Sequence, residues 1–301
     1  MKTKFFLITT GLMATFFFVT ACGNNKAGNV REVAQNSSTI PQDETKPLNT
    51  FPWDFPEGIA LENPEMGQYV LSPYTFYPKK MEEKDNPGKE TYIFYSTRLN
   101  KYGEPHSTVG EVEMPNSLII PLPKVKKAKE GDVLLTWWQS GSGLKRAIVT
   151  DASDPEAPKV DYLDLDYSDD PANPLIGNKH SNEQIKPATF DVIEDGQWQS
   201  GAPIAALEGS SWKEAILIHT AADKVLALGF AGKIMVYERS ACKLIPLRQN
   251  IQVGDNVMAV FVGSFSEGYK VTRIDRKIGR VWVEKDGKQR IVSILQVVKS
   301  L

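Results

Sequence analysis

The chain has only two cysteines among 301 residues, Cys22 and Cys242, so it can form at most one intramolecular disulfide. It has only three histidines, His106, His180 and His219, and these are too far apart to form a spaced pair of metal ligands. A zinc site built from paired Cys and His is therefore not expected, and no metal or other cofactor is predicted. Long helical periodicity is also missing, which predicts a low helix content.

A large excess of charge of one sign is absent as well. The formal net charge is −2, so no nucleic-acid partner is expected. The charges are unevenly distributed, however. Residues 131–200 carry 13 acidic and 5 basic residues, whereas residues 251–301 carry 5 acidic and 9 basic residues. This asymmetry predicts attraction between neighbouring parts of the chain, and the alternative is an anionic polymer bound to the C-terminal part.

The N-terminus has the three parts of a secretory signal. Lys2 and Lys4 give a basic start, and the apolar run Phe5–Val19 follows. This run is shorter than the roughly 20 residues that a transmembrane helix needs. Val19-Thr20-Ala21-Cys22 closes it and resembles the lipobox of bacterial lipoproteins. The resemblance implies cleavage before Cys22 and acylation of its thiol, so residues 1–21 are interpreted as a lipoprotein signal peptide.

The segment after the lipobox is expected to be a tether. Residues 22–50 are rich in Asn, Lys, Gly, Ser, Thr, Gln, Pro and acidic residues, a composition typical of a disordered segment. Gly23 and the absence of an acidic cluster after Cys22 favour an outer-membrane lipoprotein that faces the periplasm. If Cys22 carries lipid, Cys242 has no disulfide partner and is expected to be a small buried apolar residue.

Short runs of β-branched and aromatic residues, separated by Gly, Pro, Asp and Asn, predict a mainly β structure from Phe51 onward. A recurring Gly-x-x-(Val/Leu/Ile) pattern opens four of these runs, at Gly67, Gly131, Gly201 and Gly254. This internal repeat predicts the following division of the chain: an N-terminal β domain at 51–128, a barrel-like unit at 129–198, and two small barrels at 199–250 and 251–301.

The last of these units has the clearest pattern. A strand is predicted from Gly254-Asp255 to Val262, then a turn over 263–269 and further strands at 270–274, 280–284 and 290–298. Asp286-Gly287 is a strong hairpin signal between the last two. The spacing predicts a small closed or nearly closed barrel.

This unit resembles the Tudor and agenet modules, which belong to the Src-homology-3-like barrels. The resemblance lies in Gly254-Asp255-x-Val257-Met258-Ala259, Gly268-Tyr269-x-Val271, Val281-Trp282-Val283 and Asp286-Gly287. Residues 201–247 match more loosely and residues 131–167 only in part. The resemblance implies three or four tandem small barrels behind the signal peptide and the tether.

Aromatic side chains are the candidate ligand-binding residues. In Tudor-like modules an open cage of aromatics binds a cation through cation–π attraction. The resemblance assigns this position to Phe261, Phe265, Tyr269 and Trp282, with adjacent positive charge from Arg273, Arg276, Lys277 and Arg280. The alternative is that Trp282 and Phe261 pack in the core or between barrels.

Two other motifs invite a catalytic or metal-binding interpretation. Ser140-Gly141-Ser142-Gly143 follows an apolar strand but lacks the Gly-x-Ser-x-Gly elbow of a nucleophile, so a hairpin loop is predicted. The carboxylates between Asp161 and Asp170 lack the central Gly and terminal Glu of an EF-hand. We expect Asp164 and Asp166 on the solvated face of a strand, and a calcium site is the alternative.

The sequence thus predicts a membrane-anchored bacterial envelope lipoprotein that acts as a non-catalytic binding module. Its expected partners are the membrane, through the lipid on Cys22, and a protein or an envelope polymer. Repeated small barrels with short loops favour interaction surfaces over deep reaction pockets. The alternatives are an envelope hydrolase that acts on a glycan or related polymer, and a structural envelope spacer.

Overall fold

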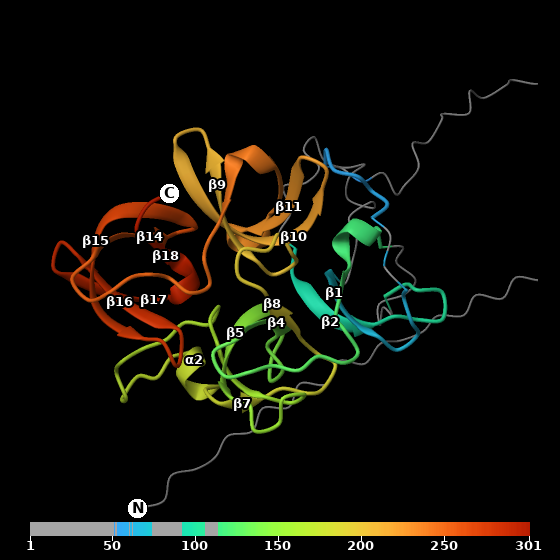
Figure 1. The fold of residues 1–301 in the computed structure, drawn as a ribbon, viewed down its shortest axis with the longest axis horizontal. Coiled ribbons are helices and arrows are strands. Elements are labelled where there is room, and N and C mark those ends of the chain that lie inside the picture. Colours follow the sequence, from blue (N-terminus) through green and yellow to red (C-terminus); the bar gives the residue numbers. More distant parts are fainter. Residues whose placement is uncertain (1–50, 52, 60, 62, 74–91, 106–113) are drawn as a thin grey trace, which may run out of the picture. The chain divides into compact units, whose positions relative to one another are not determined.

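The computed structural model describes residues 51, 53–59, 61, 63–73, 92–105 and 114–301 (Figure 1). The predicted signal peptide, Cys22 and the predicted tether lie outside these residues. In the described part, strands far outnumber helices, which confirms the mainly β class. No helix within these ranges is long and apolar enough to cross a bilayer.

Four sets of antiparallel strands follow one another along the chain, and we call them the first to fourth units. The second unit contains β4 (Val133–Trp137), β5 (Leu144–Asp151), β6 (Lys159–Tyr162), β7 (Glu183–Gln184) and β8 (Asp191–Ile193). The short helix α2 (Ile176–Lys179) lies between β6 and β7. The strand order is β7-β6-β5-β4-β8. The first strand therefore pairs with both the second and the last.

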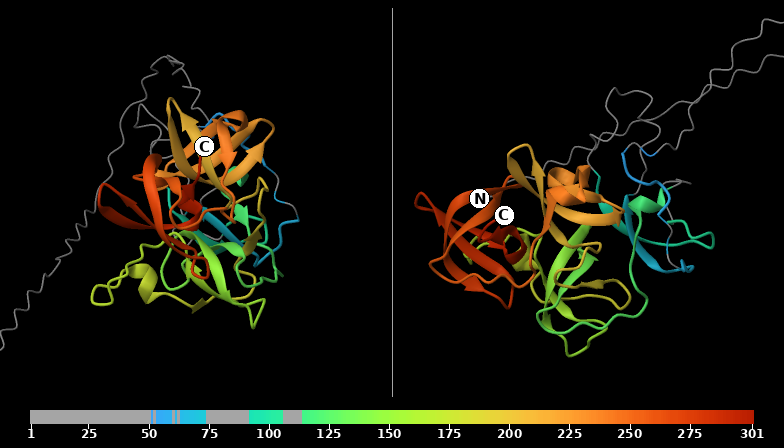
Figure 2. Two further views of the ribbon diagram at one scale, coloured as in Figure 1. Left: turned by 60° about the vertical axis from the view of Figure 1, so that its left-hand side comes forward. Right: turned by 45° about the horizontal axis from the view of Figure 1, so that its top comes forward.

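The third and fourth units repeat this order. The third consists of β9 (Pro203–Glu208), β10 (Ser211–Ala221), β11 (Lys224–Gly229), β12 (Ile234–Glu238) and β13 (Cys242–Leu244). The fourth consists of β14 (Asn256–Phe261), β15 (Ser264–Asp275), β16 (Arg280–Lys285), β17 (Lys288–Ser293) and β18 (Val297–Val298). In each, the last strand returns to pair with the first (β13 with β9, β18 with β14). Figure 2 shows these strands from two further directions.

Short 3-10 turns also recur at matching places. η3 (Arg239–Ala241) precedes the last strand of the third unit, and η4 (Ile294–Gln296) precedes that of the fourth. A further 3-10 turn, η2 (Phe230–Gly232), connects β11 to β12. A single pairing, Lys213 with Ser264, joins the third and fourth units into one ten-stranded sheet.

The first unit has three described strands, β1 (Tyr69–Pro73), β2 (Phe94–Arg98) and β3 (Ile120–Pro121), in the order β2-β1-β3. This corresponds to the second, first and last strands of the other units, and η1 (Asn116–Leu118) again precedes the last strand. None of the sheets formed by the described residues closes into a barrel. The shared feature is therefore an open antiparallel sheet with a common strand order.

The recurring glycines occupy the same position in all four units. Each has a positive φ, from +80° to +95°, and lies third in a turn whose first carbonyl accepts a hydrogen bond from the fourth N–H, at 3.0–3.1 Å: Gly67, Gly131, Gly201 and Gly254. Their own N–H groups donate at 2.8–2.9 Å to carbonyls within the second strand of the unit or, in the first unit, just after it: those of Leu99, Val149, Leu217 and Val271. A turn with positive φ at its third residue favours glycine there, which explains the repeat.

Gly131→Ala is expected to lower the free energy of unfolding by about 1–2 kcal/mol, because the left-handed conformation is sterically unfavourable for an L-residue with a Cβ. No heavy atom lies within 4 Å of an added Cβ at Gly131, so the loss is conformational alone. Gly58 has equally open space and no positive φ, and Gly58→Ala is the control that should not destabilise. Urea unfolding of both variants checks this, and equal losses would contradict it.

Hydrophobic packing extends across unit boundaries. One small cluster joins Ala205 and Ile245 of the third unit to Val260, Phe265 and Val298 of the fourth. The turn of Gly201 is also packed tightly, because an added Cβ there would lie 2.9 Å from Leu135 Cβ of the second unit. The largest core cluster therefore extends through all four units, and the second unit has a further cluster of its own.

Three details differ from the predicted strands. β6 ends at Tyr162, so Asp164 lies in a turn and is partly buried, not on a solvated strand face. The predicted turn at 263–269 shrinks to Val262-Gly263, because Gly268, with φ +87°, lies at a bulge within β15. The predicted last strand, 290–298, is interrupted by η4. The serine and glycine loop at 140–143 does connect the hairpin strands β4 and β5.

Candidate binding site

A cavity of about 380 Å³ is lined by residues of all four units. The first unit contributes Tyr92–Phe94, and the second contributes the start of β5 and the turn after β6. The third contributes β10 and the β11–β12 connection, and the fourth contributes side chains from β16, β17 and η4. Because strands from distant parts of the chain meet here, this cavity is the candidate binding site.

Arg146 on β5 is the central charge of this site, with 1% of its side chain exposed. Its Nε donates to both carboxylate oxygens of Asp164, at 3.2 and 3.1 Å, and its Nη2 donates to Oδ1 at 2.7 Å. The backbone N–H of Arg146 donates to Oδ2 of the same carboxylate at 2.6 Å. Asp164 is therefore held by four hydrogen bonds from one residue.

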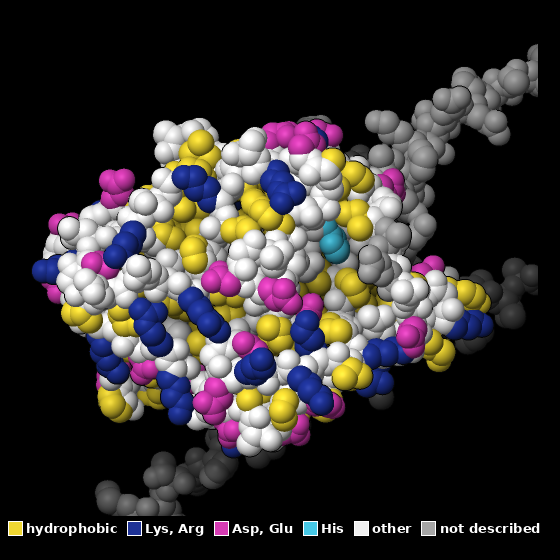
Figure 3. Space-filling view, in the orientation of Figure 1, with side chains coloured by type: hydrophobic (Ala, Val, Ile, Leu, Met, Phe, Trp, Pro, Cys, Tyr) yellow, Lys and Arg dark blue, Asp and Glu magenta, His cyan; other side chains and the backbone are white. Residues whose placement is uncertain are grey.

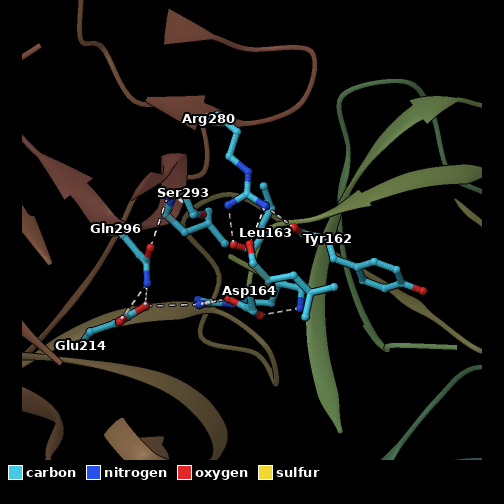
Figure 4. Close-up of polar contacts among 10 residues, drawn as sticks. Tyr162, Leu163, Asp164, Glu214, Arg280, Ser293 and Gln296 are labelled. Carbon is cyan, nitrogen blue, oxygen red and sulfur yellow. Dashed lines mark hydrogen bonds and ion pairs between the residues drawn. The ribbon is translucent and has the colours of Figure 1, made fainter. Parts of the chain in front are cut away.

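Glu214 on β10 connects this pair to the other units (Figure 4). Its Oε1 lies 3.4 Å from Nη2 of Arg146. Both of its oxygens accept hydrogen bonds from Nε2 of Gln296 on η4, at 3.2 Å each. The Oε1 of Gln296 accepts from the N–H of Ser293 at 3.2 Å. One chain of polar contacts thus runs through the second, third and fourth units.

The two carboxylates have pKa values shifted in opposite directions. Burial works against ionisation of Asp164, but the charge and hydrogen bonds of Arg146 outweigh it and hold the pKa below its usual value. Burial raises the pKa of Glu214, and the negative charge of Asp164 raises it further. Arg146 lowers this pKa, but it does not outweigh the effect of burial. The pKa of Arg146 is raised: burial lowers it, but the charges and hydrogen bonds of the two carboxylates together outweigh burial.

Arg280 on β16 makes a second buried connection between the second and fourth units. Its guanidinium donates to the carbonyl of Leu163 at 3.1 Å, and to those of Tyr162 and Leu165 at 2.5 and 2.9 Å (Figure 4). Burial lowers its pKa, and nearby carboxylates including Asp164 oppose this. Arg280 therefore organises the turn that carries Asp164 and does not supply surface charge.

The chemistry available in the cavity follows from these contacts. A general acid or base must lie within hydrogen-bond distance of a substrate atom. The carboxylates of Asp164 and Glu214 instead accept hydrogen bonds from Arg146 and Gln296, which disfavours this role. The rim is more accessible, because Ile93 and Phe230 are exposed there. On the face that Figure 3 shows, hydrophobic side chains alternate with charged ones. The cavity thus combines a floor of paired charged groups, Arg146, Asp164 and Glu214, with a rim that exposes apolar side chains.

The four aromatic residues predicted to bind a ligand have different environments. Phe261 is 51% exposed at the end of β14, whereas Phe265, Tyr269 and Trp282 are buried. Phe265 packs between the third and fourth units, and Tyr269 belongs to the large core cluster. No ring contact among the four is found within the described residues. They do not line the 380 Å³ cavity either.

Trp282 lies in the contact between the second and fourth units. The Arg273 guanidinium carbon lies 4.0 Å from the centre of its ring, and the Tyr167 ring meets it edge-on at 6.4 Å. Its Nε1 donates to a carboxylate oxygen of Asp169, which also lies 3.5 Å from Nη1 of Arg273. The cation over this ring is therefore supplied by the chain itself.

The remaining candidates have structural surroundings. Cys242 is buried, which raises the pKa of its thiol to about 11. In the described part of the chain, no three His, Cys, Asp or Glu side chains gather in a way that could hold a metal ion. Arg146, Glu214 and Gln296 were not singled out from the sequence. They have no distinctive local signal, because Arg146 lies next to Lys145 in a strand that also contains Asp151.

Comparison of the chain with known protein families gives no match, and comparison with curated protein sequences gives none either.

Proposed function

We propose that this chain is a bacterial envelope lipoprotein that binds a partner without catalysing a reaction. A lipid on Cys22 holds it in the outer membrane, where it faces the periplasm. The lipobox at Val19–Cys22 supports the anchor. The binding role rests on one observation: the cavity shared by four units has accessible apolar side chains at its rim, and its three most buried charged groups, Arg146, Asp164 and Glu214, are paired with one another.

We further propose that the second, third and fourth units are nearly closed small barrels of the Src-homology-3-like, Tudor-like type, and that the first unit is a fourth member. Their common strand order supports this, because in each the last strand pairs with the first. The recurring glycine turn and the 3-10 turns η1, η3 and η4 add support. Such tandem units create shared cavities at their junctions, where ligands are often bound.

The partner that fits this site is a protein or an envelope polymer with an apolar segment. Ile93 offers apolar contact at the rim, and Lys145 and Asp166 lie in the same lining. Deep burial of a small charged substrate is disfavoured, because Arg146 is already neutralised by Asp164 and Glu214. Partner selection would therefore depend mainly on the rim.

The test is site-specific photocrosslinking in intact cells. A benzophenone amino acid at Ile93, on the rim, should give a crosslinked product, as a discrete band for a protein or a ladder for a polymer. The matched control is Tyr102, which is also exposed but does not line the cavity. Equal crosslinking at both positions, or none at Ile93, would contradict the proposed site.

Two further measurements test the rest of the proposal. Wild-type protein should incorporate labelled palmitate and sediment with membranes, and Cys22→Ala should do neither. Purified protein incubated with envelope glycans should release no soluble fragments. Release of fragments, lost in a Glu214→Gln variant, would instead favour the hydrolase alternative, because a carboxyl group with a raised pKa is what a general acid requires.

A further inference from the structure

Two hairpin tips of the third and fourth units expose apolar side chains next to each other. Phe230 begins η2 and is 60% exposed, and Phe261 and Val262 at the β14–β15 turn are 51% and 61% exposed. Phe230 packs against Gly263, since a Cβ built on that glycine would lie 2.4 Å from Phe230 Cβ. We call Phe230, Phe261 and Val262 the hairpin-tip patch.

The backbone of this patch is strained. Val262 has φ +48° and Gly263 has φ +70°, which is the two-residue hairpin turn that requires positive φ at both positions. A β-branched residue with positive φ is a true outlier. The corresponding turn between β16 and β17 uses Asp286-Gly287, the favoured pair. An exposed valine in place of Asn or Asp indicates that the apolar side chain itself has a role.

Basic side chains flank the patch. The Arg290 guanidinium carbon lies 4.3 Å from the centre of the Phe261 ring. Lys213 Nζ donates to Ser264 Oγ at 2.9 Å, two residues beyond Val262. Lys233, which closes the turn begun by Phe230, is exposed. An apolar tip with cations around it is complementary to a bilayer surface that contains anionic lipids, where Lys and Arg are attracted to the headgroups.

The size of the patch favours a lipid surface over a protein. A stable protein interface buries about 800 Å² on each partner. Two partly covered phenylalanines and a valine offer roughly 500 Å² at most, since an aromatic side chain buries about 150–250 Å². A second copy of the chain would need more contact than this. A membrane does not need so large a contact area, because a lipid on Cys22 would already keep the protein at the membrane surface.

We infer that the hairpin-tip patch inserts into the lipid surface to which the protein is anchored, with Arg290, Lys213 and Lys233 facing anionic headgroups. The inference rests on the proposed lipid on Cys22. Only 28 residues, 23 to 50, separate Cys22 from Phe51. Even fully extended they span about 100 Å, so the patch stays within reach of the bilayer. Insertion would orient the protein and bring the cavity rim at Phe230 to the membrane surface.

The experiment uses the full-length lipidated protein with an environment-sensitive dye on Val262→Cys. Cys242 does not compete for the dye, because it is buried and the pKa of its thiol is raised to about 11. The protein is reconstituted into vesicles of equimolar phosphatidylcholine and phosphatidylglycerol. We expect the dye emission to shift to the blue and to be quenched by lipids brominated in their acyl chains. A dye on Asp286→Cys, at the matching polar turn, should keep its aqueous emission.

Each other outcome counts against the inference. If the labelled protein floats with the vesicles but the dye on Val262→Cys stays aqueous, the patch does not insert although the anchor is present. A blue shift without quenching would mean that protein covers the patch. If the protein does not float, the anchor itself is absent and the inference fails with it. An equal shift in pure phosphatidylcholine vesicles would contradict the role given to the three basic side chains.

Discussion

Replacing Arg146 with Met is expected to lower the free energy of unfolding by about 3–5 kcal/mol at neutral pH, the usual result of removing one partner of a buried ion pair. Met keeps much of the aliphatic volume, so the loss comes mainly from Asp164 and Glu214, which remain partly buried without their cation. Urea unfolding at pH 7 measures it. Lys145→Met, on the same strand and the same cavity wall, is the control and should change stability by less than about 0.5 kcal/mol.

The effect should depend on pH in a defined direction. In the wild type the pKa of Asp164 is lowered, so its contribution to stability is present above the ordinary value of 3.8 and is lost as the pH falls through the folded-state pKa. The pKa of Glu214 is raised, so its ionised form opposes folding, and this opposition disappears below 4.5. In Arg146→Met both carboxylates lack a cation and cost stability only when ionised.

The difference between wild type and Arg146→Met should therefore be largest at neutral pH and shrink near about pH 4, where carboxylates take up protons. Repeating the unfolding measurements at that pH checks the sign. A difference that is independent of pH would show that lost packing, and not unpaired charge, explains the destabilisation. Equal losses for Arg146→Met and Lys145→Met would contradict the central role of Arg146.

Trp282→Ala is the second change with a large expected effect, a loss of about 3–5 kcal/mol in the free energy of unfolding. Only 1% of this tryptophan is exposed. Its removal leaves a cavity beneath Arg273 and leaves Asp169 without the indole N–H. The thermal melting temperature should fall accordingly. Trp282→Phe, which keeps an aromatic ring in place, should lose less.

Phe261→Ala is the matched control, because Phe261 belongs to the same predicted aromatic group but is half exposed. Its loss should be no more than about 1 kcal/mol, since little apolar area returns to water. An unchanged melting temperature for Trp282→Ala, together with loss of partner crosslinking at Ile93, would support the predicted aromatic cage. A low melting temperature would assign Trp282 to the packing between units.

The local features of this fold could be predicted from sequence because their physical cause is local. Gly131 and Gly254 recur because a positive φ is needed at the third position of a turn, whatever the rest of the chain does. Asp286-Gly287 likewise indicates a tight hairpin by itself. The break at η4 was missed because Ile294 and Leu295 are apolar and fit a strand equally well.

The candidate site could not be predicted because its cause is not local. Arg146 and Glu214 are 68 residues apart, and nothing in either segment indicates that they meet. Trp282 and Phe261 occur in similar β-rich surroundings, yet one is buried and the other exposed, because burial depends on which unit packs against which strand. The aromatic composition indicated a binding surface without distinguishing these two environments.

The buried arginines also have a consequence for the order in which the chain folds. Most strand pairs connect neighbours in sequence, so each unit can form soon after it is synthesised, as expected for short-range contacts. Arg146, however, contacts Glu214, which lies 68 residues further along the chain. The carbonyls of Tyr162, Leu163 and Leu165 accept hydrogen bonds from Arg280, which lies 115–118 residues further along. The second unit therefore reaches its final stability only after the fourth has emerged, which makes the fourth unit the last of the four to complete their shared contacts.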